Sequence, residues 1–173
     1  YVLGHLIEAA IEYQASTGKR AFLDIATRAA DQAHRHFLGT NGQPGFCGHA
    51  ELEMALVELY RVTGEKRYLD LATAFVEWRG RNKVTPAGPT PRAYFQDARP
   101  LREQTTLEGH AVRAIFFATG VADVAIETRE QQGRGPSGKL DAQPLDGRRH
   151  GDERPVRFEA VVRGAMGSVF DVI

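Results

Sequence analysis

Three Gly-His pairs hold the side chains of this sequence that are best suited to chemistry. They are Gly4-His5, Gly48-His49 and Gly109-His110, and each stands near the start of a run with apolar residues at helical spacing. A neutral imidazole offers one hydrogen-bond donor and one acceptor, so several histidines around one cavity suit a polyhydroxylated ligand or a metal ion. A lone histidine in such a place more often bonds a neighbouring helix end. The recurrence favours substrate binding, and we predict that the three histidines line one pocket.

Glutamates accompany these histidines. Glu8, Glu51 and Glu53 follow the first two histidines by two to four residues, within about one helical turn. Paired carboxylates can act as acid and base or hold sugar hydroxyls, but such residues are more often solvated or cap a neighbouring helix. Glu103 and Glu108 precede the third histidine, and a capping role is the simpler interpretation for them. We therefore predict no catalytic residue among the glutamates.

Cys47 is the only cysteine of the sequence, and it lies two residues before His49. An internal disulfide is thus impossible, and so is a zinc site built from several cysteines. One cysteine and one histidine make neither a metal site nor a catalytic pair without a third group. We predict no metal ligand and no cofactor within this chain.

Helical hairpins are the elements that must position these residues. Apolar residues recur at steps of three and four, the period of a helix with one buried face. Thr-Gly pairs end the runs at 17–18, 63–64 and 119–120, where glycine supplies the left-handed conformation of a helix end. The predicted inner helices are residues 5–14, 51–62 and 104–118, with partner helices at 22–37, 68–78 and from 121 onward. The first two units are 46 residues apart, which fits stacked helix pairs and exceeds the roughly 34 residues of a tetratricopeptide repeat.

The sequence divides into a helical part, residues 1–127, and a C-terminal tail, residues 128–173. The tail is rich in arginine, glycine and proline and has no apolar period between residues 133 and 155. Such a composition buries too little apolar surface to offset the entropy of the chain. We predict an irregular or disordered tail, either divergent or the product of a reading-frame error. The connection at residues 80–100 is long enough to be functional or disordered.

The charges balance, since 22 lysines and arginines face 22 aspartates and glutamates. No net field attracts nucleic acid or an anionic membrane, and no apolar run approaches the roughly 18 residues of a membrane span. We therefore expect neither as a partner. The sequence begins without a methionine or a basic leader, which favours a piece of a longer protein. The compartment is open, with the cytoplasm as the simplest expectation.

Five separated segments carry a family resemblance. They are Gly4-His5-Leu6-Ile7-Glu8-Ala9-Ala10, the run from Gly48-His49 to Thr63-Gly64, Tyr94-Phe95-Gln96-Asp97, Arg102-Glu103-Gln104 and Gly109-His110-Ala111-Val112-Arg113-Ala114. In this order they resemble the catalytic domain of glycoside hydrolase family 127, the β-L-arabinofuranosidases, over residues 1–127. Ala50 and Ala98 depart from the pattern of that family.

The resemblance implies an all-α fold, an incomplete (α/α)6 toroid of about three helical hairpins followed by the irregular tail. It implies retaining hydrolysis of β-L-arabinofuranosyl groups, with a zinc-held cysteine thiolate as nucleophile and a glutamate as acid/base. By motif, His5, His49 and His110 are the sugar-contacting histidines. The nucleophile, the acid/base and the zinc ligands belong to a later part of the family barrel and are not matched, so zinc is implied only for the full-length family. This chain alone is expected to be inactive.

Two other functions fit the residues. A helical-repeat scaffold would bind a partner along its inner face. A sugar isomerase or epimerase on the same toroid would use the histidines for proton transfer. In either case, part of a helical ring leaves apolar faces uncovered, so we also expect association between chains.

Overall fold

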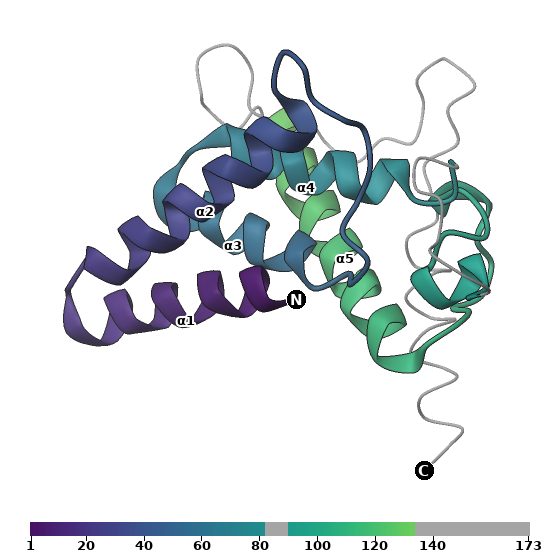
Figure 1. Ribbon diagram of the computed structural model, residues 1–173, viewed down its shortest axis with the longest axis horizontal. Helices are drawn as coiled ribbons and strands as arrows, with labels where there is room; N and C mark the ends of the chain where they lie inside the picture. The colour runs from purple at the N-terminus through teal and green to yellow at the C-terminus, as the bar shows by residue number, and fades with distance from the viewer. Residues whose placement is uncertain (82–89, 134–173) are drawn as a thin grey trace.

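The computed structural model describes residues 1–81 and 90–133, which form five α-helices (Figure 1). The helices are α1 (Val2–Thr17), α2 (Ala21–Leu38), α3 (Leu52–Thr63), α4 (Lys66–Trp78) and α5 (Ala111–Gly133). Two short 3-10 helices, η1 (Arg92–Phe95) and η2 (Leu101–Glu103), lie between α4 and α5. The described ranges contain no strand, so the all-α prediction is confirmed.

The first two predicted hairpins are present, and their turns use the expected chemistry. Gly18 and Gly64 adopt φ values of 70° and 74°, and their backbone N–H groups donate to the carbonyls of Gln14 and Tyr60. A left-handed glycine of this kind satisfies carbonyl groups that the helix end leaves open. Each glycine therefore ends one helix and lets the next begin within a few residues.

The third predicted hairpin is wrong, because α5 is one continuous helix that passes through Gly120. A Cβ atom added at Gly120 would lie 2.8 Å from the Cβ atom of Glu53 on α3. This glycine therefore lets two helices approach closely instead of turning the chain. A Thr-Gly pair can therefore either end a helix or allow a close contact between two helices. At Gly120 the contact with Glu53 of α3 shows that it does the second.

The start of α5 also differs from the prediction of residue 104. Gly109 has a φ of 87°, and a Cβ atom there would lie 1.9 Å from the carbonyl oxygen of Ala93. The backbone at Gly109 is thus held in a conformation that an α-helix excludes, and the helix begins at Ala111.

The predicted irregular tail is wrong for residues 128–133, where α5 continues. Residues 134–173 lie outside the described residues, and so does the middle of the connection after α4, at 82–89. Within the part of the chain that the structure describes, no helix is long and apolar enough to cross a membrane.

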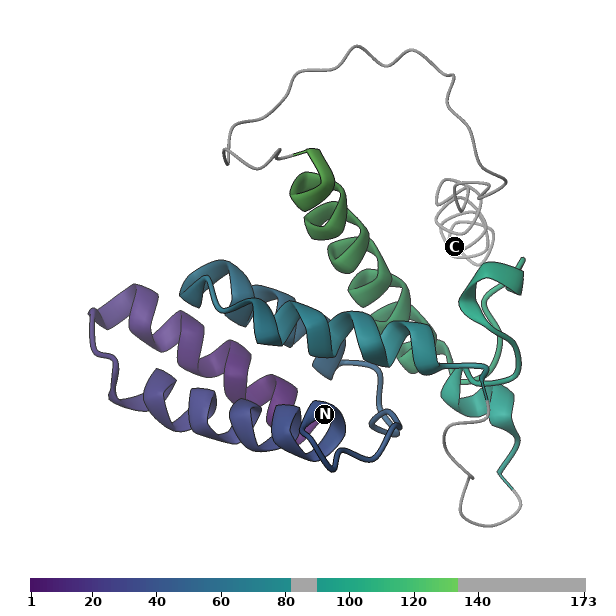
Figure 2. The same ribbon diagram turned by 90° about the horizontal axis from the view of Figure 1, so that it is seen from above.

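Helix α3 is the centre of the molecule. It packs against α1, α4 and α5, while α2 covers α1 and contacts α4. Figure 2 shows α5 crossing the two hairpins obliquely. The core side chains at these contacts include Ile7, Leu23, Leu56, Phe75 and Phe117, all buried. This arrangement brings the start of α1, the start of α3 and the first half of α5 to one place.

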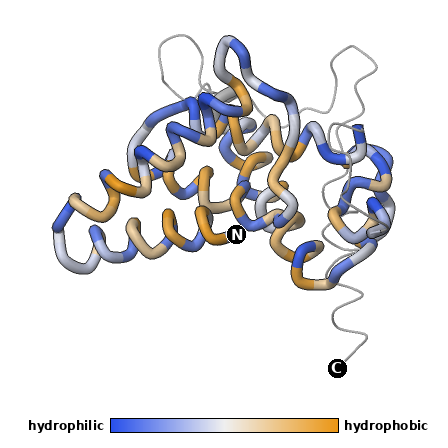
Figure 3. The backbone as a smooth tube through the Cα atoms, viewed as in Figure 1, coloured by the Kyte–Doolittle hydropathy of each residue, from blue (hydrophilic) through white to orange (hydrophobic). Residues whose placement is uncertain are grey.

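Some apolar side chains remain at the surface. Figure 3 shows hydrophobic residues along the start of α1 and on the lower part of α5. On α5, Val112, Ile115 and Ile126 are about half exposed. Association through these side chains remains a prediction.

Candidate functional site

Two of the three predicted histidines lie around one aromatic ring. His5 is in the first turn of α1, and His49 lies just before α3. The ring of Phe116, on α5, is 6.4 Å from the His5 ring and 5.6 Å from the His49 ring, measured between centroids. Tyr1 lies 6.1 Å from His5 and 5.4 Å from His49. The site thus gathers imidazoles from two different hairpins beside aromatic faces.

His110 has a different aromatic neighbour. It is exposed, directly before α5, and its ring is 5.3 Å from that of Tyr94 in an edge-to-face arrangement. Within the described ranges, no ring contact or hydrogen bond joins His110 to His5 or His49. The three Gly-His pairs are also not equivalent in structure, because Gly4 is inside a helix whereas Gly48 and Gly109 precede one.

His5 faces two carboxylates. Its Nδ1 atom lies 3.2 Å from Glu8 Oε2, one helical turn away, and 3.2 Å from Glu51 Oε1 at the start of α3. Room for the Glu51 side chain exists because residue 4 is glycine: a Cβ atom there would lie 1.7 Å from Glu51 Oε2. Gly4 therefore lets α1 lie directly over the carboxylate.

Glu51 is buried, and neither of its oxygens has a hydrogen bond of acceptable geometry. Burial and the nearby Glu8 carboxylate raise the pKa of Glu51 to about 7, against the opposing effect of His5. A pKa near 7 suits a general acid or base. The buried oxygens cannot touch a substrate, however, so we assign Glu51 no acid/base role.

The surroundings of His49 favour the neutral form of its ring. Burial lowers the pKa of His49, and the positive charge of Arg113 lowers it further. Arg113 is itself fixed, since its guanidinium donates to the Gly48 carbonyl and lies 4.7 Å from the Tyr94 ring. The Nδ1 atom of His49 is buried and has no hydrogen-bond partner. A neutral ring with an unused polar atom suits a hydroxyl-bearing ligand.

Glu53 belongs to the core and not to the group of side chains around His5 and His49. Its carboxylate accepts two hydrogen bonds from Arg79, and both side chains are 0% exposed. Arg79 also donates to the Phe95 and Cys47 carbonyls and stacks over Phe46. This arginine joins α3, α4, the segment before α3 and η1, so it supports the segment that carries His49.

Cys47 cannot serve as a nucleophile here. Burial and the negative charge of Glu53 raise the pKa of the Cys47 thiol to about 12, and its S–H donates to the carbonyl of His49. A protonated thiol is neither nucleophile nor metal ligand. The zinc that the family resemblance implies is held by cysteine thiolate, so Cys47 does not fit that thiolate-held site.

The segment at residues 94–97 shapes the loops beside the site. Asp97 is buried and accepts a hydrogen bond from the backbone N–H of Gly80 and another from Arg92. Gln96 has a backbone φ of 55°. The Nε2 atom of its side-chain amide donates a hydrogen bond to the backbone carbonyl of Glu108. Glu108 thus binds through its backbone, and the predicted cap by its side chain is absent among the described contacts.

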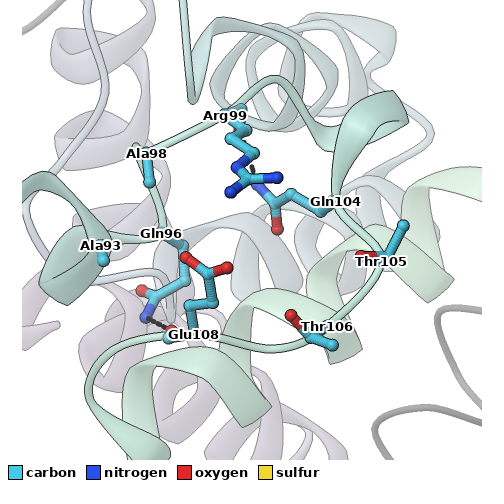
Figure 4. Close-up of a pocket in the computed structure, with 8 residues that line it drawn as sticks. All are labelled: Ala93, Gln96, Ala98, Arg99, Gln104, Thr105, Thr106 and Glu108. Carbon is cyan, nitrogen blue, oxygen red and sulfur yellow. Dashed lines mark hydrogen bonds between the residues drawn. The ribbon is translucent and has the colours of Figure 1, made fainter.

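Gln96 also lines a small pocket between η1 and the segment that leads to α5 (Figure 4). About 10 Å³ of this pocket is open to water, roughly enough for one molecule. Gln104, Thr105 and Thr106 close its other side. The candidate site is instead the His5–His49 region, where two imidazoles lie beside Phe116.

Comparison with known proteins decides the family. The family model for the GH127 catalytic domain of β-L-arabinofuranosidases matches residues 1–137 of this sequence. The chain belongs to this family. A GH127 relative, the non-reducing end β-L-arabinofuranosidase of Bifidobacterium longum subsp. longum, is 40% identical over 140 residues. The alignment covers 72% of this chain and 21% of the relative.

Solved GH127 structures agree with this assignment. A GH127 β-arabinofuranosidase superposes with a TM-score of 0.67 and 43% identity, over 73% of this chain and 19% of that one. The GH127 β-L-arabinofuranosidase of Geobacillus stearothermophilus T6 gives a TM-score of 0.67 with 39% identity, over 75% and 22%. The chain therefore spans about a fifth of the length of these relatives, and its helices are part of the helical toroid of the family.

Sequence analysis missed three features of the site. Phe116 is one apolar position among many, and Arg113 stands in the motif of the third histidine without an indication of its contacts. The approach of Glu51 to His5 joins residues 46 positions apart, and the only indication in the sequence is the glycine before His5.

Proposed function

We propose that this GH127 chain supplies part of the sugar-binding pocket of a β-L-arabinofuranosidase that acts on terminal β-L-arabinofuranosyl groups. The observation that carries the proposal is the meeting of His5 and His49 around Phe116. Imidazoles can donate to and accept from sugar hydroxyls, while an aromatic face packs against the apolar C–H groups of a sugar ring. The names of the relatives supply the substrate class.

The electrostatics of the pair suit a neutral, hydroxyl-rich ligand. A neutral His49 retains both a donor and an acceptor, and its buried Nδ1 atom has no partner. On His5, Nδ1 faces the carboxylates, which leaves Nε2 at the opposite edge of the ring for a ligand. We propose that His110 reaches the sugar from the start of α5 as the third histidine.

We further propose that the chain alone does not hydrolyse the substrate. Retaining hydrolysis needs a nucleophile and an acid/base group near one anomeric carbon. Cys47 is a protonated, hydrogen-bonded thiol, and Glu51 and Glu53 are buried. Residues outside this chain would have to provide both functions.

A chimera tests the proposal. The aligned segment of the Bifidobacterium longum enzyme is replaced by residues 1–133 of this chain, and hydrolysis of an aryl β-L-arabinofuranoside is measured. The folded chimera should be active, and His5→Ala and His49→Ala should each reduce kcat/KM by about 10–100-fold, the equivalent of about 1–3 kcal/mol for a lost hydrogen bond that leaves a buried group unpaired. His36→Ala, at an exposed histidine on α2, is the control.

Three results would oppose the proposal: full activity in both histidine variants, loss of activity in the control, or hydrolysis by this chain alone. Circular dichroism of the chimera separates a folding failure from a failure of the site.

A further inference from the structure

The carboxylate of Glu51 is the buried charged group beside His5, and the sugar proposal gives it no role. Its side chain is 0% exposed, and neither oxygen has a hydrogen-bond partner in the described part of the chain. A buried carboxylate without a hydrogen bond is costly, so a cation or a proton must compensate its charge. The geometry around Glu51 favours the cation over the proton.

Three ligand-type atoms surround one point beside Glu51. His5 Nδ1 lies 3.2 Å from a Glu8 oxygen and 3.2 Å from a Glu51 oxygen, and the three atoms all lie within 4.8 Å of one another. Two ligands bound to zinc at about 2.0–2.2 Å in tetrahedral geometry lie about 3.3–3.6 Å apart. The two separations of 3.2 Å are close to this range, so a small shift of the side chains would fit a small divalent ion between the three atoms.

From this geometry we propose that His5, Glu8 and Glu51 bind a divalent transition-metal cation such as Zn²⁺. The donor set is one imidazole nitrogen and two carboxylate oxygens, a mixture that suits Zn²⁺ better than Mg²⁺ or Ca²⁺. The two carboxylates balance the charge of the ion. This site uses no cysteine, so it is distinct from a thiolate-held zinc.

The exposure of the three side chains gives the ion an entry path. Glu51 forms the buried floor, whereas Glu8 is 32% and His5 is 54% exposed. The ion would enter from the side of α1 and keep its fourth position for water, as three-ligand zinc sites do. The inference does not depend on sugar binding, because it concerns the Nδ1 edge of His5 only.

Isothermal titration of the metal-free chain with ZnCl₂ tests the proposal. The chain should bind one Zn²⁺, and EDTA should reverse the accompanying rise in Tm. Glu51→Gln and Glu8→Gln should each weaken binding by at least about 100-fold, since loss of even an outer-shell partner costs about 10–100-fold. Glu12→Gln, on an exposed glutamate one turn further along α1, is the matched control and should bind like the unaltered chain.

Two results would overturn the site. The first is an absence of Zn²⁺ binding, which leaves a proton shared between Glu8 and Glu51 as the compensating charge. The second is equal binding by the Glu51→Gln, Glu8→Gln and Glu12→Gln chains, which identifies an adventitious ion only. If Glu51→Gln does not fold, Glu8→Gln decides, because Glu8 is partly exposed and its replacement removes no core contact.

Discussion

Arg79 offers the sharpest test of how the fold supports the site. Arg79→Met removes the partner of Glu53, which is 0% exposed, and two hydrogen bonds to the carbonyls of Phe95 and Cys47, at 2.6 and 3.2 Å. Breaking a buried ion pair by removing one partner costs about 3–5 kcal/mol, because the other charge stays buried. For a fold with a stability of about 5–15 kcal/mol, that loss is a large fraction.

The assay is urea unfolding of the Arg79→Met chain, followed by circular dichroism and by the fluorescence of Trp78, the single tryptophan. The control is Arg81→Met, in which the lost pair with Glu77, at 3.1 Å, is exposed and worth about 1 kcal/mol or less. Glu53→Gln combined with Arg79→Met should recover part of the loss, since no charge then remains buried. The reasoning fails if Arg79→Met costs no more than Arg81→Met.

Three further predictions concern other parts of the fold. Gly120→Ala should lower the free energy of unfolding by about 1–3 kcal/mol despite the better helix propensity of alanine, because its Cβ overlaps α3; an unchanged Tm would contradict the close helix contact. Cys47 should react with a thiol reagent at pH 8 far more slowly in the native chain than in urea, because burial raises the pKa of its thiol to about 12; equal rates would show an accessible thiolate. Burial tends to raise the pKa of Asp31, but hydrogen bonds from Arg67 and Tyr68 lower it overall. The ionised Asp31 therefore stabilises the fold above the pKa of the unfolded chain, and this contribution is lost as the pH falls through the pKa of the folded chain. Asp31→Asn should therefore flatten the decline of stability below about pH 4, and parallel pH curves would refute this.

The helices of this chain are largely readable from its sequence, because apolar spacing and Thr-Gly pairs act locally. Gly18 and Gly64 end their helices as their sequence context predicts. Gly120 has the same context but faces Glu53 across a helix contact, and no local pattern encodes that neighbour. Gly109 is the converse case, since its positive φ and the close approach of its backbone to Ala93 keep it out of the helix, and the apolar spacing of the sequence shows neither.

The site was predictable only in part, because its contacts, like that of Gly120, join residues far apart in the sequence. His5 and His49 follow from the repeated motif, and they do meet at Phe116. For His110 the repeated motif is the main argument; its ring lies 5.3 Å from that of Tyr94, and its contact with the sugar stays a prediction. Long-range pairs such as His5 with Glu51 depend on how α1 crosses α3, which a single sequence does not display.

The central claim is that His5 and His49 contact a furanose sugar. The most direct measurement is an NMR titration of the ¹⁵N-labelled chain with methyl β-L-arabinofuranoside, with methyl β-D-glucopyranoside as the control ligand. The account predicts saturable shifts of the His5 and His49 imidazole resonances with the furanoside only, lost in His5→Ala. Shifts that are absent, equal for both sugars or confined to exposed His36 on α2 would contradict it.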